Sequence, residues 1–219
     1  MIIKNSGAML SPLLRRFLQI FFVIAFIAIL AAEVYVGSNR YRSDAQVMGQ
    51  SAALFITASR IAALLAAMMI MLQFALSARF KILDITFGFG RLMRLHSIMG
   101  PTAVVLAASH PLLLYTPKVY SLGALRLALW PELLGMLALT MLAIIIATTL
   151  GRTFLQLKFK TWRRIHQLAF TVTAIVAVHS IVLGNSLKSG WPRFAWLTVI
   201  AAYAAAFIWV KLVKPYKLK

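Results

Sequence analysis

The chain has 219 residues, of which 62% are hydrophobic and only 12% are charged, and its mean hydropathy is +0.89. These values lie far outside the composition of soluble globular domains, which could not bury so much apolar surface, so we expect an integral membrane protein. The sequence contains no cysteine, which excludes disulfides, thiolate haem ligands, iron–sulfur clusters and a thiol nucleophile.

The formal net charge of +19 comes from 23 basic and 4 acidic residues. On a soluble domain such a charge would favour nucleic acid as a partner. Here the basic residues cluster in the connections between apolar segments, as expected for loops that contact anionic lipid headgroups. The sequence therefore predicts membrane lipid as a partner and no nucleic acid.

Six segments are long and apolar enough to span a bilayer, which requires about 20 residues. They are residues 15–36, 52–76, 93–115, 132–150, 163–184 and 194–213. The first follows basic residues, as a secretory signal would, but its apolar run is too long and has no convincing cleavage site, which predicts a retained anchor. We expect an all-α fold, an integral membrane six-helix bundle over residues 15–213, between a cytoplasmic segment 1–14 and a tail 214–219.

The basic residues are divided unevenly between the two sets of connections. Sixteen lie on the side of both termini and six lie on the other side, while Arg60 lies inside the second segment. The positive-inside rule places the richer side in the cytoplasm. We therefore expect a multi-pass protein of a bacterial inner membrane with both termini cytoplasmic, in which the third and fifth segments run from inside to outside.

All four histidines lie in the third and fifth segments, where ionisable groups are costly and mark a site by default. His96 and His110 are 14 residues apart and His166 and His179 are 13 apart, which is about 21 and 19.5 Å along a helix. Each segment thus has an imidazole near each face of an apolar core about 30 Å thick. Because the two segments run in the same direction, His96 pairs with His166 at the inner level, and His110 with His179 at the outer level. Two such axial pairs are the geometry for stacking two haems across a membrane.

Other uses of membrane histidines remain open at this point. A single one is often only an interhelical hydrogen-bonding residue, and imidazoles also serve in metal clusters and proton relays. Four histidines at matched depths are hard to explain as structural residues, and metal clusters and relays normally include carboxylates. The acidic residues of this chain all lie near segment ends: Glu33, Asp44, Asp84 and Glu132.

Helix geometry places one constraint on the fifth segment. At 100° per residue, a spacing of 13 leaves His179 about 140° around the helix from His166. The fifth helix must therefore twist, bulge or kink, or else present its two ligands from different sides. Pro101 predicts a kink between the two histidines of the third segment.

Arg60 is a further charge inside the apolar segments, early in the second one and so at the outer level. An isolated cation there needs an anionic partner, and a haem propionate would supply it. The alternative is an arginine whose side chain reaches the headgroups from one or two turns below them.

Short motifs around these residues resemble the ferric reductase-like transmembrane domain shared by ferric reductases and NADPH oxidases. They are Leu95-His96, Ser109-His110-Pro111, Trp162-Arg163-Arg164-Ile165-His166, Val178-His179-Ser180 and Ser59-Arg60. The spacings of 14 and 13 match the family's bis-haem core, and the resemblance covers essentially the whole chain. It implies an oxidoreductase with two haem b groups, held by the four histidines, and an arginine near the outer haem. Electrons would pass singly from a cytosolic flavin through both haems to an external acceptor, either a ferric complex or oxygen.

The resemblance also implies an electron donor on the cytoplasmic side. In this family the FAD and NAD(P)H sites lie in a cytosolic dehydrogenase region after the sixth helix, and the segment from Lys211 to Lys219 resembles the lead-in to that region. The Gly88-x-Gly90 pair is no dinucleotide fingerprint, because no strand precedes it and the third glycine is missing. We expect a further domain or a partner flavodehydrogenase to supply both cofactors.

Two alternatives stand beside this interpretation. The haem membrane subunit of the periplasmic methionine sulfoxide reductase system has a similar Trp-x-x-Leu-His run in its fifth helix. It has no histidine at the place of His96, so His96 favours the two-haem branch. A transporter or structural membrane protein without a cofactor is an alternative of another class, and a haem spectrum distinguishes it from the others.

Overall fold

The computed structural model describes residues 11–116, 130–188 and 190–213. Within these ranges every regular element is a helix, and six helical stretches are long and apolar enough to cross a membrane. The predicted tail 214–219, most of the segment 1–14 and the connection that carries Lys118 and Arg126 lie outside the described residues.

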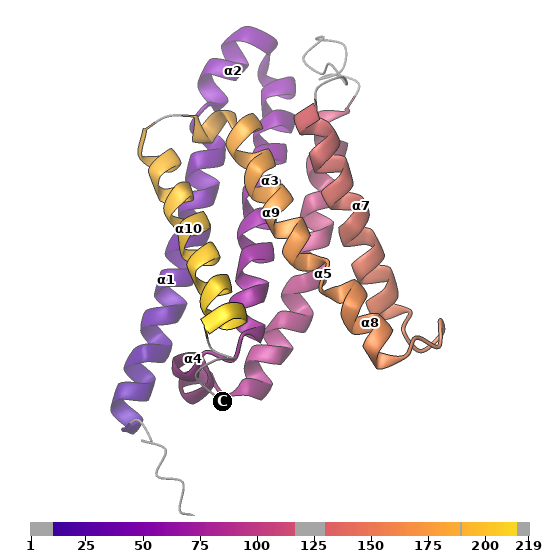
Figure 1. Ribbon diagram of the computed structural model, residues 1–219. Coiled ribbons are helices and arrows are strands. Elements are labelled where there is room, and N and C mark those ends of the chain that lie inside the picture. Colours follow the sequence, from indigo (N-terminus) through magenta and orange to yellow (C-terminus); the bar gives the residue numbers. More distant parts are fainter. Residues whose placement is uncertain (1–10, 117–129, 189, 214–219) are drawn as a thin grey trace, which may run out of the picture.

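The helices follow the predicted segments closely (Figure 1). The long ones are α1 (Pro12–Ser38), α3 (Gln50–Ser77), α5 (Phe89–Leu114), α7 (Trp130–Leu150), α9 (Ala169–Leu183) and α10 (Gly190–Ile208). The short ones are α2 (Tyr41–Met48), α4 (Lys81–Phe87), α8 (Phe159–His166), a 3-10 turn (Asn185–Leu187) and a π-helical turn (Trp209–Val213). The predicted all-α membrane bundle of six spanning segments is confirmed.

Helix α3 is the centre of the bundle. Half of its most apolar stretch is buried, more than in any other spanning helix, and it packs against α1, α2, α5 and α9. One apolar cluster joins Leu64 of α3 to Val36 of α1 and Trp196 of α10. Another joins Ile70 of α3 to α5, α7 and α9. The central helix therefore contacts both helices that carry the outer histidines.

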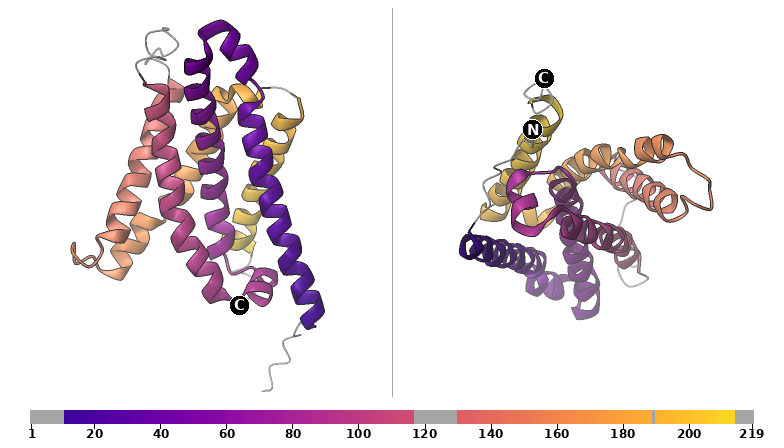
Figure 2. Two further views of the ribbon diagram at one scale, coloured as in Figure 1. Left: turned by 180° about the vertical axis from the view of Figure 1, so that it is seen from behind. Right: turned by 90° about the horizontal axis from the view of Figure 1, so that it is seen from below.

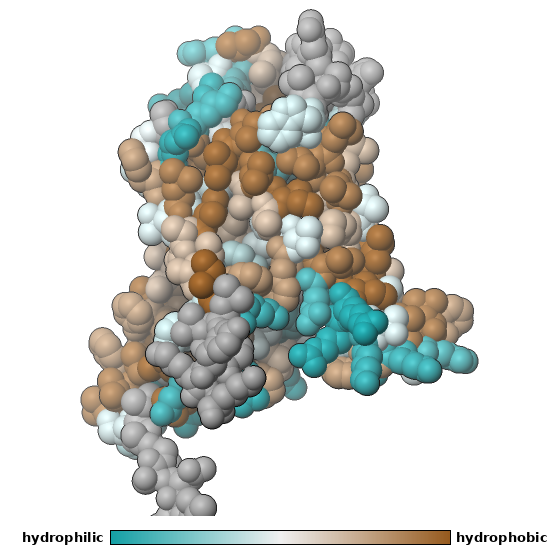
Figure 3. Space-filling model, in the orientation of Figure 1, coloured by the Kyte–Doolittle hydropathy of each residue, from teal (hydrophilic) through white to brown (hydrophobic). Residues whose placement is uncertain are grey.

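The outside of the bundle is suited to lipid. The most apolar stretch of α1 has no buried residue, and large side chains such as Phe17 and Ile24 are exposed on it. Figure 3 shows hydrophobic residues over the middle of the bundle and hydrophilic residues gathered toward its ends. Helix α1 begins and α10 ends at the same end of the molecule (Figures 1 and 2). This arrangement is that of an integral, multi-pass membrane protein.

The fifth predicted segment is interrupted between its two histidines, which is one of the two outcomes that their spacing allowed. Helix α8 ends at His166 and α9 begins at Ala169. At the break, the Leu168 N–H donates to the Ile165 carbonyl at 3.0 Å and the Phe170 N–H donates to the Gln167 carbonyl at 3.1 Å. Both hydrogen bonds join residue i to residue i+3, as in a 3-10 helix, and so narrow the helix locally. The break contains neither proline nor glycine. By contrast, α5 continues as one helix through Pro101.

Candidate functional site

The inner histidine pair joins α5 to α8. His96 lies in the second turn of α5, and His166 is the last residue of α8. Their ring centroids are 6.0 Å apart and their planes are inclined by 51°. Both side chains are half-buried. The structure therefore brings together the two residues that the sequence assigns to the inner level.

Polar contacts at the inner pair come mainly from α3. Nδ1 of His96 lies 3.2 Å from the main-chain carbonyl oxygen of Gln73. The side-chain amide of Gln73, oriented so that its nitrogen donates to the His96 carbonyl at 3.1 Å, also approaches the same Nδ1 at 2.6 Å. Nδ1 of His166 is buried and has no hydrogen-bond partner among the described residues. The inner rings are thus incompletely fixed by the protein.

Aromatic rings lead from the inner pair to the surface. The indole of Trp162 lies against the imidazole of His166, with centroids 5.2 Å apart and planes inclined by 30°, and Phe159 lies 5.6 Å from Trp162. The Arg152 guanidinium lies over both aromatic rings, 5.5 Å from the Phe159 centroid and 5.4 Å from that of Trp162. Trp162 also donates to Thr149 of α7 at 3.2 Å. This cluster places positive charge and π surface beside the inner pair.

The outer histidine of α5 is bound to the central helix. Ser59 of α3 is fully buried, and its hydroxyl donates to the main-chain carbonyl of His110 at 2.9 Å. Nδ1 of His110 lies 2.8 Å from that hydroxyl oxygen and 3.1 Å from the Ser59 carbonyl oxygen. The hydroxyl proton is engaged and a carbonyl only accepts, so Nδ1 must donate. Nε2 of His110 therefore keeps its lone pair.

The outer histidine of α9 is bound to α7. Nδ1 of His179 donates to the carbonyl oxygen of Pro131 at 2.7 Å, which leaves the Nε2 lone pair free here as well. Gly135, one turn further along α7, is so close that a Cβ there would lie 2.6 Å from Cε1 of the ring. His110 and His179 are near enough for an electrostatic interaction. The two residues that the sequence assigns to the outer level therefore lie within electrostatic range of each other.

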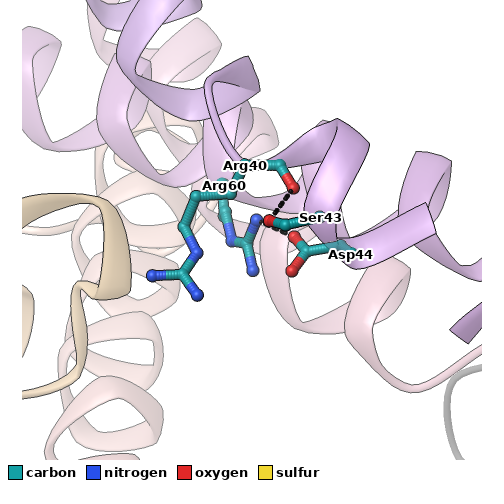
Figure 4. Close-up of polar contacts among 4 residues, drawn as sticks. All are labelled: Arg40, Ser43, Asp44 and Arg60. Carbon is teal, nitrogen blue, oxygen red and sulfur yellow. Dashed lines mark hydrogen bonds and ion pairs between the residues drawn. The ribbon is translucent and has the colours of Figure 1, made fainter. Parts of the chain in front are cut away.

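Arg60 has an anionic partner within the chain. Its guanidinium forms an ion pair with the carboxylate of Asp44 in α2, and the two side chains are only 17% and 10% exposed. Figure 4 shows the two groups directed at each other, with Arg40 and Ser43 at the start of α2 beside them. The Ser43 hydroxyl donates to the Arg40 carbonyl at 2.9 Å. Arg60 directly follows Ser59, so this ion pair lies one residue along α3 from the contact with His110.

Sequence reasoning did not identify the partners of these residues. Main-chain carbonyls such as that of Pro131 have no sequence signature, and a buried serine beside an arginine is a weak one. Asp44 was noticeable as one of only 4 acidic residues, but its position near a segment end gave no sign of pairing with Arg60. Across the described ranges, no cluster of three or more His, Cys, Asp and Glu side chains could hold a metal ion.

Taken together, six apolar spans and two level-matched pairs of imidazoles define an integral multi-pass membrane protein with two internal histidine sites. The family described as "ferric reductase like transmembrane component" matches residues 62–178, more than half of the chain, so the chain belongs to this family. The predicted resemblance is confirmed, and it indicates a membrane component of an oxidoreductase that transfers electrons across the membrane. The matched range includes His96, His110 and His166 and ends one residue before His179. Comparisons with curated proteins and with solved structures gave no match.

Proposed function

We propose that this protein conducts electrons one at a time across the membrane, using two haem b groups. The inner haem would be held by His96 and His166, and the outer haem by His110 and His179. The donor would be a cytosolic flavin dehydrogenase that draws on NAD(P)H, on the same polypeptide or on a separate protein. The acceptor would be an external ferric complex or oxygen. Bound haem supplies the one-electron chemistry, while the residues of this chain hold the iron and fix the imidazoles.

The separation of the inner rings is the observation that carries the proposal. An imidazole nitrogen binds a transition-metal ion at about 2 Å, and the ring centre lies about 1 Å beyond that nitrogen. Two imidazoles on opposite sides of one ion therefore have centres about 6 Å apart. The centroids of His96 and His166 are separated by 6.0 Å. This spacing fits a shared iron.

The chemistry of the donors supports haem as the bound group. Each histidine pair offers two imidazoles, so an iron held there must receive its remaining ligands from its own cofactor, as it does from a porphyrin. The Nδ1 protons of His110 and His179 are directed at neighbouring oxygen atoms, which leaves each Nε2 available to a metal. No Cys-x-x-Cys-His motif exists for covalent attachment, which favours haem b.

The inner surface has features that suit a flavoprotein donor. Arg152 lies over the aromatic rings of Phe159 and Trp162, and Trp162 lies against His166. Exposed basic side chains surround this cluster or lie at the start of α5: Lys158, Lys160, Arg163, Arg164, Arg91 and Arg94. Positive charge of this kind attracts an acidic flavodehydrogenase or a flavin phosphate. We propose that this face is cytoplasmic and receives the electrons, and that both termini share that side.

Arg60 would act at the outer haem. Its guanidinium has five N–H donors in a fixed fork, of which the ion pair with Asp44 engages Nη1. The remaining donors suit a propionate, as the resemblance to the family implies. Asp44 would then hold Arg60 in place as well as balance its charge.

Two measurements test the proposed function. The purified protein should contain two low-spin, six-coordinate haem b groups per chain, counted by absorbance after extraction. A count of one would favour a single-haem subunit such as that of the methionine sulfoxide reductase system, and the absence of haem would favour a transporter. In proteoliposomes, a reductant enclosed on the α8 side should reduce a membrane-impermeant ferric chelate outside. Haem-loaded vesicles that show no such transfer would overturn the proposal.

A further inference from the structure

Helix α7 carries no histidine, yet it contacts the ring of the outer ligand His179 directly. The carbonyl oxygen of Pro131 accepts from Nδ1 at 2.7 Å. A Cβ at Gly135 would lie 2.6 Å from Cε1, 3.1 Å from Nδ1 and 3.2 Å from Nε2. We propose that Gly135 is a positioning residue, whose missing side chain lets α7 hold the His179 ring in the orientation needed to bind the outer haem iron. This inference rests on the proposed role of His179 as an iron ligand.

The two contacts are parts of one feature of the helix. In an α-helix the carbonyl of residue i accepts from the N–H of residue i+4, so the Pro131 carbonyl belongs to the turn that ends at Gly135. The ring of His179 is therefore seated on a single turn of α7. Its Nδ1 is held by the start of that turn, and its Cε1 corner occupies the space next to the end of the turn. Only glycine leaves that space open.

A methyl group at Gly135 would displace the ligating nitrogen. Carbon atoms in ordinary contact are about 3.5–4.0 Å apart, so a Cβ at 2.6 Å from Cε1 would push the ring or the helix back by about 1 Å. Cε1 is bonded to Nε2, so this movement carries the metal-binding nitrogen with it. Metal–ligand distances tolerate only about 0.2 Å of change. The ring also cannot swing away without lengthening its hydrogen bond to Pro131.

A matched control exists in α5, near the inner ligand His96. Gly100 is a helical glycine of α5, four residues after His96, and a Cβ there would meet only the side-chain amide of Gln73 at 4.0 Å. Gly135→Ala and Gly100→Ala make the same chemical change in membrane helices. Only the first one crowds a histidine ring. Any general effect of replacing a helix glycine should therefore appear in both variants.

The experiment measures the haem content, the low-spin electron paramagnetic resonance spectrum and the two reduction potentials of each purified variant. Gly135→Ala should lose outer haem, or shift its spectrum and potential, while the inner haem keeps its wild-type values. Gly135→Val should lose more outer haem than Gly135→Ala. Gly100→Ala should retain both haems with unchanged spectra. Wild-type outer-haem content, spectrum and potential in Gly135→Ala would overturn the inference.

Two further variants separate this inference from the proposed function and from simple misfolding. His179→Leu should empty the outer site. If it retains both haems, the proposed ligand is wrong and the inference about Gly135 fails with it, whereas an empty outer site in His179→Leu beside a wild-type outer haem in Gly135→Ala overturns the inference alone. In a His179→Gly background, free imidazole should restore the outer spectrum whether or not Gly135 is replaced, because an untethered ring can move away from the methyl group. If Gly135→Ala prevents this rescue as well, it acts on the fold of α7 and the positioning role is overturned.

Discussion

The outer histidine pair is held by the protein more completely than the inner pair. His110 hydrogen-bonds to Ser59 on the central helix, and His179 to the Pro131 carbonyl on α7. At the inner level, Nδ1 of His166 is buried without a partner in the described part of the chain. Nδ1 of His96 lies 3.2 Å from the Gln73 carbonyl oxygen and 2.6 Å from the Gln73 amide nitrogen. The outer rings are therefore preorganised with Nε2 free, whereas His166 of the inner pair has a hydrogen bond still to gain.

The difference follows from where each pair lies on its helices. His110 and His179 are inside α5 and α9, next to continuous stretches of α3 and α7 that supply hydrogen-bonding atoms. His166 is the final residue of α8, directly before the break, and its neighbour is the indole of Trp162. A buried polar nitrogen without a partner is unfavourable by about 1–3 kcal/mol. The inner level is thus the part of the site with more freedom to rearrange when a cofactor or a donor binds.

The largest expected effect comes from removing the ligands themselves. His110→Leu or His179→Leu should empty only the outer site, and His96→Leu or His166→Leu only the inner site, so each variant should retain one haem of the two. Haem counting together with a redox titration measures which one remains. If the comparison between levels is correct, the protein with an empty inner site should keep an outer haem of unchanged potential. Full haem content in all four variants would refute the ligand assignment.

The sequence predicted the levels and the pairs, because depth in a membrane follows directly from position along a helix. It also predicted an interruption of the fifth segment as one of two outcomes, since 13 residues do not return a helix to the same face. It could not predict the support of the rings. The Pro131 carbonyl and the space beside Gly135 exist only once α7 packs on α9. The pairing of Arg60 with Asp44 likewise requires α2 to fold back against α3.

The second prediction concerns the ion pair between Asp44 and Arg60, which lies at the outer level and should affect the potential of the outer haem alone. Asp44→Asn leaves the Arg60 cation unbalanced near the outer haem, which should raise the potential of that haem because its reduced state is the more negative one. Arg60→Ala leaves the Asp44 carboxylate unbalanced and should lower the potential, and it should also weaken outer-haem binding if Arg60 holds a propionate. Arg60→Lys should recover only part of that binding, because an ammonium group lacks the planar fork.

The double variant and the inner haem provide the controls for these charge changes. Asp44→Asn combined with Arg60→Ala should return the outer potential toward the wild-type value, because the net charge is restored. The inner haem potential should stay constant throughout the series. Shifts of the same sign in both single variants, or equal shifts at both haems, would contradict an electrostatic role for the ion pair.

The third prediction changes the support of the inner pair. Gln73→Glu would place a carboxylate beside Nδ1 of His96, where the amide now lies. A carboxylate that accepts from Nδ1 makes the imidazole a stronger donor to ferric iron, so the inner potential should fall while the outer one stays constant. Gln73→Leu, which removes the polar atoms without adding charge, should leave the inner potential nearer to that of the wild type. If the reduction potential of the inner haem is the same in Gln73→Glu, Gln73→Leu and the wild type, Gln73 does not support His96.

The smallest effect is expected at Ser59, because the outer ring is held there twice. Ser59→Ala removes the hydroxyl that lies 2.8 Å from Nδ1 of His110, but the Ser59 carbonyl at 3.1 Å still accepts from the ring. The outer potential should rise slightly, since His110 loses one acceptor and becomes a weaker donor to ferric iron, and stability should fall by about 1 kcal/mol for the lost hydrogen bonds. Ser109→Ala is the matched control, because Ser109 is half-buried, adjoins His110 and donates to the Val105 carbonyl of its own helix at 2.8 Å. Redox titration and thermal unfolding of both variants measure these two effects. Equal changes in outer-haem potential and in stability for Ser59→Ala and Ser109→Ala would show that the contact between Ser59 and His110 does not tune the outer site.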